Sequence, residues 1–285
     1  MAILVDISQI IISNVAMAQF LGRRDGTVID ESFMKHMIIN SLRLYNQKFK
    51  REYGQMIICV DSKNTWRKAV FPHYKAKRHE AKEQSSTDWN VVYSSLNGMI
   101  KDLKEYFPYV VVKVEGCEAD DIIGTLARNL SEKEKVVIVS GDKDFGQLLG
   151  ANVAQFNPID KKFITITNPA AFLKELIIRG DKGDGIPNML SDDDAIVTGK
   201  RQGSIVQSKL DVWLNKESAQ FCENNKVLRN FERNRMLIDL RCTPPELQNT
   251  IWEEYEKPAN GNRQTMTTYF MAHRMRNLLE SIEQF

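Results

Sequence analysis

Three apolar runs in this chain end in an aspartate, and this pattern constrains the fold more than any other feature. The runs AILVDIS, MIICVDS and VVIVSGDKD end in Asp6, Asp61 and Asp142. Four or more apolar or β-branched residues that stop at a polar residue are typical of a buried parallel strand. Because ligands of α/β proteins bind at the carboxyl ends of such strands, we expect the three carboxylates to converge there.

Further acids belong to the same candidate site. They lie in the helix-opening segment GCEADD, in SGDKD and in the glycine-broken loop RGDKGDG, and they are Glu118, Asp120, Asp121, Asp144, Asp181 and Asp184. Crowded carboxylates repel one another and raise each other's pKa unless cations neutralise them. Hard oxygen ligands without cysteine or clustered histidine favour Mg²⁺ or Mn²⁺ over Zn²⁺. The sequence therefore predicts a divalent metal site.

Strand and helix patterns alternate through the first half of the chain, which predicts an α/β fold with a mainly parallel central sheet flanked by helices. Strands are expected at residues 2–6, 56–60, 109–114, 136–139, 153–156 and 163–167. Helices are expected at about 31–50, from an N-cap region at 86–88 to 107, and from 118 onward. Beyond residue 168 the pattern becomes helical and polar.

The composition gives few hints of a membrane or a disulfide framework. The 285 residues are 42% hydrophobic, and no apolar run approaches the roughly 18 to 20 residues of a membrane span. The start, MAILVDISQIII, lacks the basic region of a signal peptide. The four cysteines show no CxxC spacing, so we expect reduced thiols. We predict a cytoplasmic protein with no membrane partner.

A basic strip at residues 62–82 interrupts the α/β pattern. It contains Lys63, Arg67, Lys68, Lys75, Lys77, Arg78 and Lys82, with Trp66, Phe71, His73 and Tyr74 between them. A solvated charged face is the simplest explanation, but interleaved aromatic residues favour a surface that binds phosphates and stacks on bases. Because residues 62–86 lack a clean period, we expect a flexible loop or helical arch over the strand ends.

A second irregular segment, SDDDAIVTGKRQG, covers residues 191–203. Its aspartates, Asp192, Asp193 and Asp194, are called here the acidic triplet. We expect the acidic triplet to start a helix or to lie on the surface, and not to bind metal.

Five motifs resemble, in order, those of the 5′-nuclease superfamily of flap endonucleases and polymerase-associated 5′-exonucleases. They are VDIS, VDSKN before a basic segment with YKAKR, GCEADD, SGDKDFGQL and RGDKGDGIPN, and they cover about residues 2–190. Within this superfamily the chain is similar to the ribonucleases H of T-even-like bacteriophages around STDW and NRMLIDL and in its closing phenylalanine.

The resemblance implies a 5′ to 3′ nuclease with exonuclease, ribonuclease H and flap endonuclease action that removes lagging-strand RNA primers and leaves 5′-phosphates. It also implies two Mg²⁺ ions, with Mn²⁺ as a substitute. We assign the tighter ion to Asp6, Asp61, Glu118, Asp120 and Asp142, and the second to Asp121, Asp144, Asp181 and Asp184. The family's arch residues fall on Tyr74, which we expect to stack on a base, and on Lys75 and Arg78, which we expect to neutralise the scissile phosphate.

The chain departs from the family after the last acidic loop. Members usually have a GxGxK-type helical hairpin that binds duplex DNA through a monovalent cation, whereas this chain has IPNMLSDDDAIVTGKRQG. We therefore expect a weaker or differently built duplex contact. The expected nucleic-acid contacts are Lys63, Arg67, Lys68, Lys77, Lys82, Lys200 and Arg201.

These patterns divide the chain into a nuclease core at residues 1–170 and a helical DNA-binding region at 171–285. Forked or flapped DNA and RNA–DNA hybrid are the expected substrates of a monomer in a phage-infected bacterial cell. A sliding clamp and a single-strand-binding protein are candidate partners of the tail NLLESIEQF, although we favour packing within the protein for this tail.

Two other functions fit parts of the pattern. A PIN-like endoribonuclease that cuts single-stranded RNA shares the carboxylate-ringed α/β core, but such domains are shorter and carry fewer acids. A module that holds forked DNA without cutting it is the second alternative. Each acid taken singly is also explained as a helix cap, a first-turn acid or a turn residue, so the case depends on their joint placement.

Overall fold

The sheet of this protein is mainly parallel, as predicted. The computed structural model describes residues 1–25, 30–78 and 89–285. The strand order is β3-β2-β1-β4-β5-β6, and only the β5–β6 pair is antiparallel. The strands are β1 (Ala2–Asp6), β2 (Gln55–Val60), β3 (Val110–Lys113), β4 (Val136–Val139), β5 (Val153–Asn157) and β6 (Lys162–Ile164).

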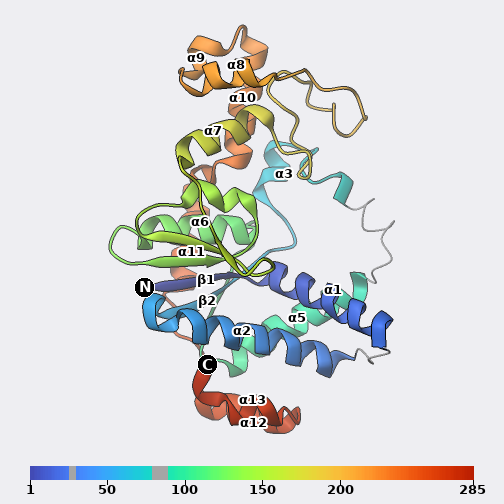
Figure 1. The fold of residues 1–285 in the computed structure, drawn as a ribbon, viewed down its shortest axis with the longest axis vertical. Helices are drawn as coiled ribbons and strands as arrows, with labels where there is room; N and C mark the ends of the chain where they lie inside the picture. Colours follow the sequence, from blue (N-terminus) through green and yellow to red (C-terminus); the bar gives the residue numbers. More distant parts are fainter. Residues whose placement is uncertain (26–29, 79–88) are drawn as a thin grey trace.

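Helices cover both faces of this sheet (Figure 1). On one face lie α1 (Ile7–Asp25), α2 (Glu31–Tyr53) and α5 (Trp89–Tyr106), and on the other lie α6 (Ala119–Leu130) and α11 (Pro245–Tyr255). Side chains of a strand alternate between faces. Accordingly Ile3 and Val5 of β1 pack with the first group, and Ala2 and Leu4 pack with the second.

Two details of the predicted elements are wrong. The segment after β1 forms the long helix α1, which the sequence patterns did not predict. The last strand, expected at residues 163–167, is the shorter β6 and follows a turn in which Lys161 has φ 54°. The predicted N-cap region at 86–88 lies outside the described residues.

A second group of helices stands beyond the strand ends, in the upper part of Figure 1. It comprises α3 (Trp66–Val70), α7 (Pro169–Arg179), α8 (Gln207–Leu214), α9 (Ser218–Phe221) and α10 (Asn225–Ile238). The apolar faces of α7, α8, α9 and α10 form a cluster of their own, which includes Phe71 and Tyr74 of the basic strip. The strip is therefore anchored at its base by two buried aromatic side chains.

The C-terminal segment returns to the sheet. The helices α12 (Arg263–Ala272) and α13 (Arg276–Glu280) lie at the end of the molecule opposite α8 and α9 (Figure 1). Phe285 is buried in the same cluster as Ile3, and Ile251 of α11 joins the cluster on the other face. Packing of the tail within the protein is thus confirmed. The division at residue 170 stays a prediction, but the hydrophobic core does not follow it.

The remaining global expectations concern thiols and membranes. All four cysteines are free, as predicted. In the described ranges, no helix is both long and apolar enough to cross a bilayer.

Candidate active site

Three adjacent strands deliver aspartates to one place. Because β1 lies between β2 and β4, Asp6 at the end of β1 is flanked by Asp61 after β2 and Asp142 beyond β4. Burial, followed by the negative charges of Asp61 and Asp142, raises the pKa of Asp6 to about 7. The predicted convergence of these three carboxylates is confirmed.

Neutral donors hold the first two of these aspartates. The Ser8 hydroxyl donates to Asp61 Oδ2 at 2.6 Å, and the Ala119 amide at the start of α6 donates to Asp61 Oδ1 at 2.8 Å. The Ser140 hydroxyl donates to Asp6 Oδ2 at 3.2 Å. These bonds orient the carboxylates without cancelling their charge.

Two more acids, Asp120 and Asp144, add negative charge that no ion pair within the described ranges compensates. Desolvation raises the pKa of Asp120 well above its ordinary value against the opposing effect of Lys75. Burial and the nearby charges of Asp142 and Asp181 raise the pKa of Asp144 to about 7. Asp144 Oδ1 is buried and has no hydrogen-bond partner among the described residues. A buried carboxylate oxygen without a partner is costly unless a cation approaches it.

Glu118 differs, because basic and phenolic side chains hold it. It receives hydrogen bonds from the Tyr74 hydroxyl at 2.8 Å, the Lys75 ammonium at 2.5 Å and the Arg67 guanidinium at 3.1 Å. Burial opposes its charge, but the cations Lys75 and Arg67 outweigh burial and lower the pKa of Glu118. Glu118 is therefore ionised and fixed in place.

The acidic loop at residues 181–185 closes against the basic strip. The Lys75 amide donates to the Asp184 carbonyl at 2.8 Å, and the Arg78 guanidinium donates to Asp184 Oδ1 at 2.5 Å. Gly185 has φ +76°, and a Cβ there would lie 2.7 Å from the His73 carbonyl oxygen, so only glycine fits. Lys75 itself has φ 55°, a conformation that costs a non-glycine residue energy and is concentrated at functional sites.

Asp181 at the start of the same loop also pairs with a lysine. The Lys143 ammonium lies 2.6 Å from Asp181 Oδ2. Burial opposes the charge of Asp181, but this bond and backbone donors lower its pKa. Lys143 was not predicted as a site residue, although its position in the sequence between Asp142 and Asp144 indicated that it lies near the site.

Asp121 is a correction to the predicted ligand set. Its side chain is fully buried and pairs with both terminal nitrogens of the Arg67 guanidinium at 2.9 Å. It also accepts hydrogen bonds from Trp66 Nε1, the Thr243 hydroxyl and the Glu118 amide. Because its side chain has no exposed surface and all its partners lie inside the protein, Asp121 is a structural residue and not a metal ligand, unlike Glu118, whose side chain is 10% exposed.

The predicted roles of Arg67 and Tyr74 in the basic strip are also wrong. Both side chains are 2% exposed, so Arg67 cannot contact a nucleic-acid backbone and Tyr74 cannot stack on a base. Each instead binds the acids of the α6 start, and Arg67 Nε also donates to the Leu237 carbonyl at 2.8 Å. A charge pattern alone does not say which basic residues point inward, because the partners lie far away in sequence.

The other predicted contacts divide by exposure. Lys63, Lys68, Lys77 and Arg201 are exposed, and Arg78 is half exposed. Lys200 is exposed and pairs with Asp194 at 2.8 Å. Lys82 lies outside the described residues.

No three acids, histidines or cysteines within the described part of the chain are arranged as ligands of a single ion. Lys75, Arg78 and Lys143 instead draw Glu118, Asp184 and Asp181 toward themselves. The donor set still fits a hard divalent cation, because Asp144 Oδ1 lacks a partner among the described residues and because burial, together with repulsion between the acids, raises the pKa values of Asp6 and Asp144. A cation bound there would relieve that repulsion.

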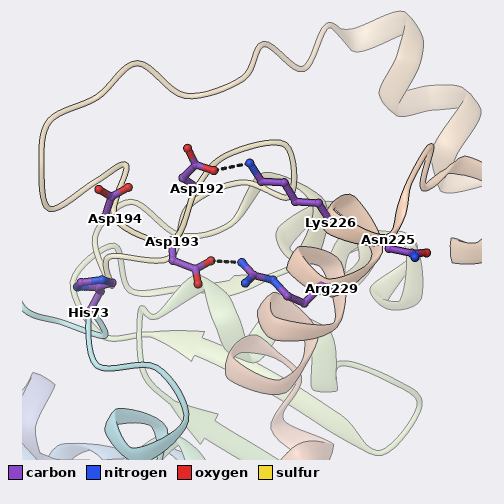
Figure 2. A pocket seen from close by; sticks show the side chains of 7 residues that line it. All are labelled: His73, Asp192, Asp193, Asp194, Asn225, Lys226 and Arg229. Atoms are coloured by element: carbon purple, nitrogen blue, oxygen red, sulfur yellow. Dashed lines mark hydrogen bonds and ion pairs between the residues drawn. The ribbon is translucent and has the colours of Figure 1, made fainter.

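The acidic triplet lies apart from these acids, on the wall of a hollow of about 570 Å³. Figure 2 shows Asp192 directed at Lys226 and Asp193 at Arg229, with distances of 2.5 Å and 2.6 Å. Both basic residues belong to α10. Residues 191–203 contain no helix or strand, so the alternative of a helix start is wrong. None of the three aspartates is buried, which confirms the predicted surface location.

Two protein-family models match the chain. The model for the 5′-3′ exonuclease N-terminal resolvase-like domain matches residues 2–176. The model for the C-terminal part of T4 RNase H matches residues 171–285.

Individual proteins agree with these matches. Ribonuclease H of Enterobacteria phage T4 is 31% identical over 99% of this chain and 95% of its own length. A 5′-3′ exonuclease of Aquifex aeolicus is 28% identical over 61% of this chain and 62% of its own length. The bacteriophage T5 flap endonuclease, solved with DNA and metal ions, has the same fold, with a TM-score of 0.63 and 17% identity over 90% of this chain and 99% of that one.

Proposed function

This chain belongs to the 5′-3′ exonuclease family and is a nuclease that hydrolyses phosphodiester bonds, and from this premise we propose its metal, substrates and role. We propose that it is a Mg²⁺-dependent 5′ to 3′ nuclease that acts on RNA–DNA hybrid and on flapped DNA. Its role is the removal of lagging-strand RNA primers during phage DNA replication. The similarity to phage T4 ribonuclease H over nearly its full length supports this role.

The observation that carries the metal proposal is a group of acids that form no ion pair with any described lysine or arginine. Asp6, Asp120 and Asp144 have raised pKa values at the ends of parallel strands and at the start of α6. We assign one Mg²⁺ to Asp6, Asp61, Glu118, Asp120 and Asp142, and a second to Asp144, Asp181 and Asp184. When bound, two such ions supply an activated water and stabilise the attacking and leaving oxygens of an in-line displacement.

The side chains of the basic strip complete the site. Lys75 lies beside Glu118 and 3.6 Å from Asp184 Oδ2, where its ammonium neutralises charge that develops on the scissile phosphate. Arg78 is 53% exposed, so its guanidinium reaches a phosphate that approaches from solvent. The buried Tyr74 hydroxyl orients Glu118 and does not contact the substrate.

Nucleic acid approaches over the exposed lysines of the same strip. Lys63, Lys68 and Lys77 are placed to contact the backbone near the cut, and Lys200 and Arg201 to contact it farther away. The bacteriophage T5 relative was solved with DNA, which supports a DNA substrate here. Contacts with a sliding clamp or a single-strand-binding protein, and a monomeric state, stay predictions.

The decisive experiment compares three labelled substrates: a 5′-flap DNA, an RNA–DNA hybrid, and a circular single-stranded RNA without ends. In Mg²⁺ we expect cutting of the first two from the 5′ end, with a 5′-phosphate on the retained strand and full inhibition by EDTA. Mn²⁺ should replace Mg²⁺. Cutting of the circular RNA with the flap left intact would instead establish a PIN-like endoribonuclease, and binding without cutting would overturn the nuclease proposal.

A further inference from the structure

Gln155 is a buried polar residue in a strand that carries none of the predicted site residues. It lies on β5, opposite Ile138 of β4, and its side chain is fully buried. A buried amide destabilises the folded state unless its hydrogen-bonding groups find partners. The identity of those partners therefore indicates why glutamine is accommodated here.

The Gln155 side chain binds two carbonyls of the loop that follows β4. Its Nε2 donates to the Ser140 carbonyl at 2.9 Å and to the Asp142 carbonyl at 2.6 Å. Its Oε1 has no partner among the described residues. Rotation of the amide by 180° would set Oε1 against two carbonyl oxygens, so the hydrogen bonds themselves fix the orientation of the amide.

Both carbonyls belong to the turn that presents the metal-binding acids. Within this turn the Asp142 amide donates to the Ser140 hydroxyl at 3.1 Å, and the Asp144 amide donates to Asp142 Oδ1 at 2.9 Å. The Ser140 hydroxyl in turn donates to Asp6. Gln155 thus holds the main chain at both ends of Gly141, and the orientation of three carboxylates depends on that segment.

We propose that Gln155 is a positioning residue for the divalent metal site: it fixes the Ser140–Asp142 main chain and so places Asp142 and Asp144 for the ions. This inference rests on the proposed function. Partners of this kind, one step behind the ligands, typically contribute 10- to 100-fold in metal affinity or activity. Gln155 would itself contact neither the ions nor the substrate, because its amide faces main-chain carbonyls.

The test replaces the amide by a side chain of similar shape, Gln155→Met. We expect Mn²⁺ binding, measured by calorimetry on the nucleic-acid-free protein, to weaken about 10-fold or more. The rise in melting temperature that Mg²⁺ produces should shrink in parallel. The Kd for flap DNA in EDTA should stay within about twofold of wild type, and excess Mg²⁺ should restore much of kcat, because a misplaced ligand lowers metal occupancy.

The matched control is Tyr109→Phe, which removes a buried hydroxyl that has no partner among the described residues, directly before β3. It should leave the metal affinity unchanged. If Gln155→Met is unfolded at the assay temperature, Gln155→Asn decides, because its amide is one methylene too short to reach both carbonyls. Wild-type metal affinity in a folded Gln155 variant would overturn the inference, whereas failure of wild type to cut in Mg²⁺ would overturn the proposed function.

Discussion

The acids at the strand ends and the acidic triplet consist of the same residue type in opposite circumstances. Each member of the acidic triplet has a basic partner: Asp192 pairs with Lys226, Asp193 with Arg229 and Arg233, and Asp194 with Lys200. The hydrogen bond from Lys226 lowers the pKa of Asp192. At the strand ends, by contrast, Asp6 and Asp144 have pKa values of about 7 because burial and mutual repulsion are not compensated.

This difference distinguishes the acids that hold the fold together from the acids that are available for catalysis. Charges that the fold already neutralises hold segments together, as Asp193 does between the irregular loop and α10. Charges that the fold leaves unneutralised require an outside cation. Asp121 belongs to the first class although it lies one residue from Asp120, which belongs to the second.

The largest test of this contrast is Asp142→Asn against Asp193→Asn. Loss of one negative ligand at the strand ends should slow cleavage in Mg²⁺ about 1000-fold, since activity depends on both ions and on their positions. Asp193→Asn should change the rate less than about threefold, as expected for a surface ion pair. Single-turnover cleavage of a labelled flap measures both, and the affinity for the flap in EDTA should be retained. Comparable losses in the two variants would contradict the distinction.

The second test compares two neighbouring lysines of the basic strip. Lys75 is mostly buried against Glu118, whereas Lys77 is exposed. Lys75→Ala should lower kcat about 100-fold, because it removes both a phosphate-neutralising charge and a partner of Glu118. Lys77→Ala should mainly raise KM and its dependence on salt. A large fall in kcat for Lys77→Ala, with mainly a raised KM for Lys75→Ala, would instead identify the exposed Lys77 as the catalytic cation.

A third test uses stability in place of activity. Asp144→Asn should stabilise the metal-free protein at pH 8 by about 2 kcal/mol, or about 4 °C in melting temperature. The gain arises because the neutral amide removes a buried, repelled charge. Because the pKa of Asp144 is raised to about 7 in the folded state, against about 4 in the unfolded chain, wild type loses this stability as pH rises from about 4 to 7.

The advantage of Asp144→Asn should therefore shrink as pH falls below 7 and disappear at about pH 4, because folded wild type takes up a proton at Asp144 that the unfolded chain does not yet bind. Thermal melts in EDTA across this range measure it. Cleavage in Mg²⁺ should fall in the same variant, so activity and metal-free stability change in opposite directions. A variant that is less stable than wild type at pH 8 would show that Asp144 is held by an attractive contact.

The smallest effect is expected for the acidic triplet itself. Asp193→Asn should lower the free energy of unfolding by about 0.5–1 kcal/mol at low salt, and by less in high salt, because the side chains of Asp193 and its partner Arg229 are 39% and 60% exposed, although that of Arg233 is only 8% exposed. Urea unfolding at two salt concentrations measures it. A loss that is independent of salt would place Asp193 among the buried structural acids.

The fold was predictable where one strong pattern dominated. Buried parallel strands appear as apolar runs, so β1, β2 and β4 could be read directly with the acids at their ends. The helix α1 could not, because its sequence is rich in β-branched isoleucines that favour strands. Its buried residues Ile7, Ile10 and Ile11 show the helical spacing only once the sheet face is known.

The site was predictable in residue type but not in orientation. Clustered acids identify a cation site, yet nothing local to GCEADD distinguishes Asp120 from Asp121. Arg67 decides between them, from a segment more than fifty residues earlier. Likewise, the outward direction of Lys77 and the inward direction of Arg67 depend on tertiary partners that sequence spacing does not reveal.

The way in which the first half of the chain contacts α10 affects how freely this region can diverge. Arg67 Nε donates to the Leu237 carbonyl, Gln147 Nε2 donates to the Ile238 carbonyl at 3.1 Å, and Gln147 Oε1 accepts from the Leu240 amide at 3.0 Å. All three bonds join a side chain to main chain, and every amino acid except proline supplies the same main-chain groups. These three bonds therefore survive substitutions at Leu237, Ile238 and Leu240 as long as the helix ends at the same place, and only the burial of these side chains restricts which residues can replace them.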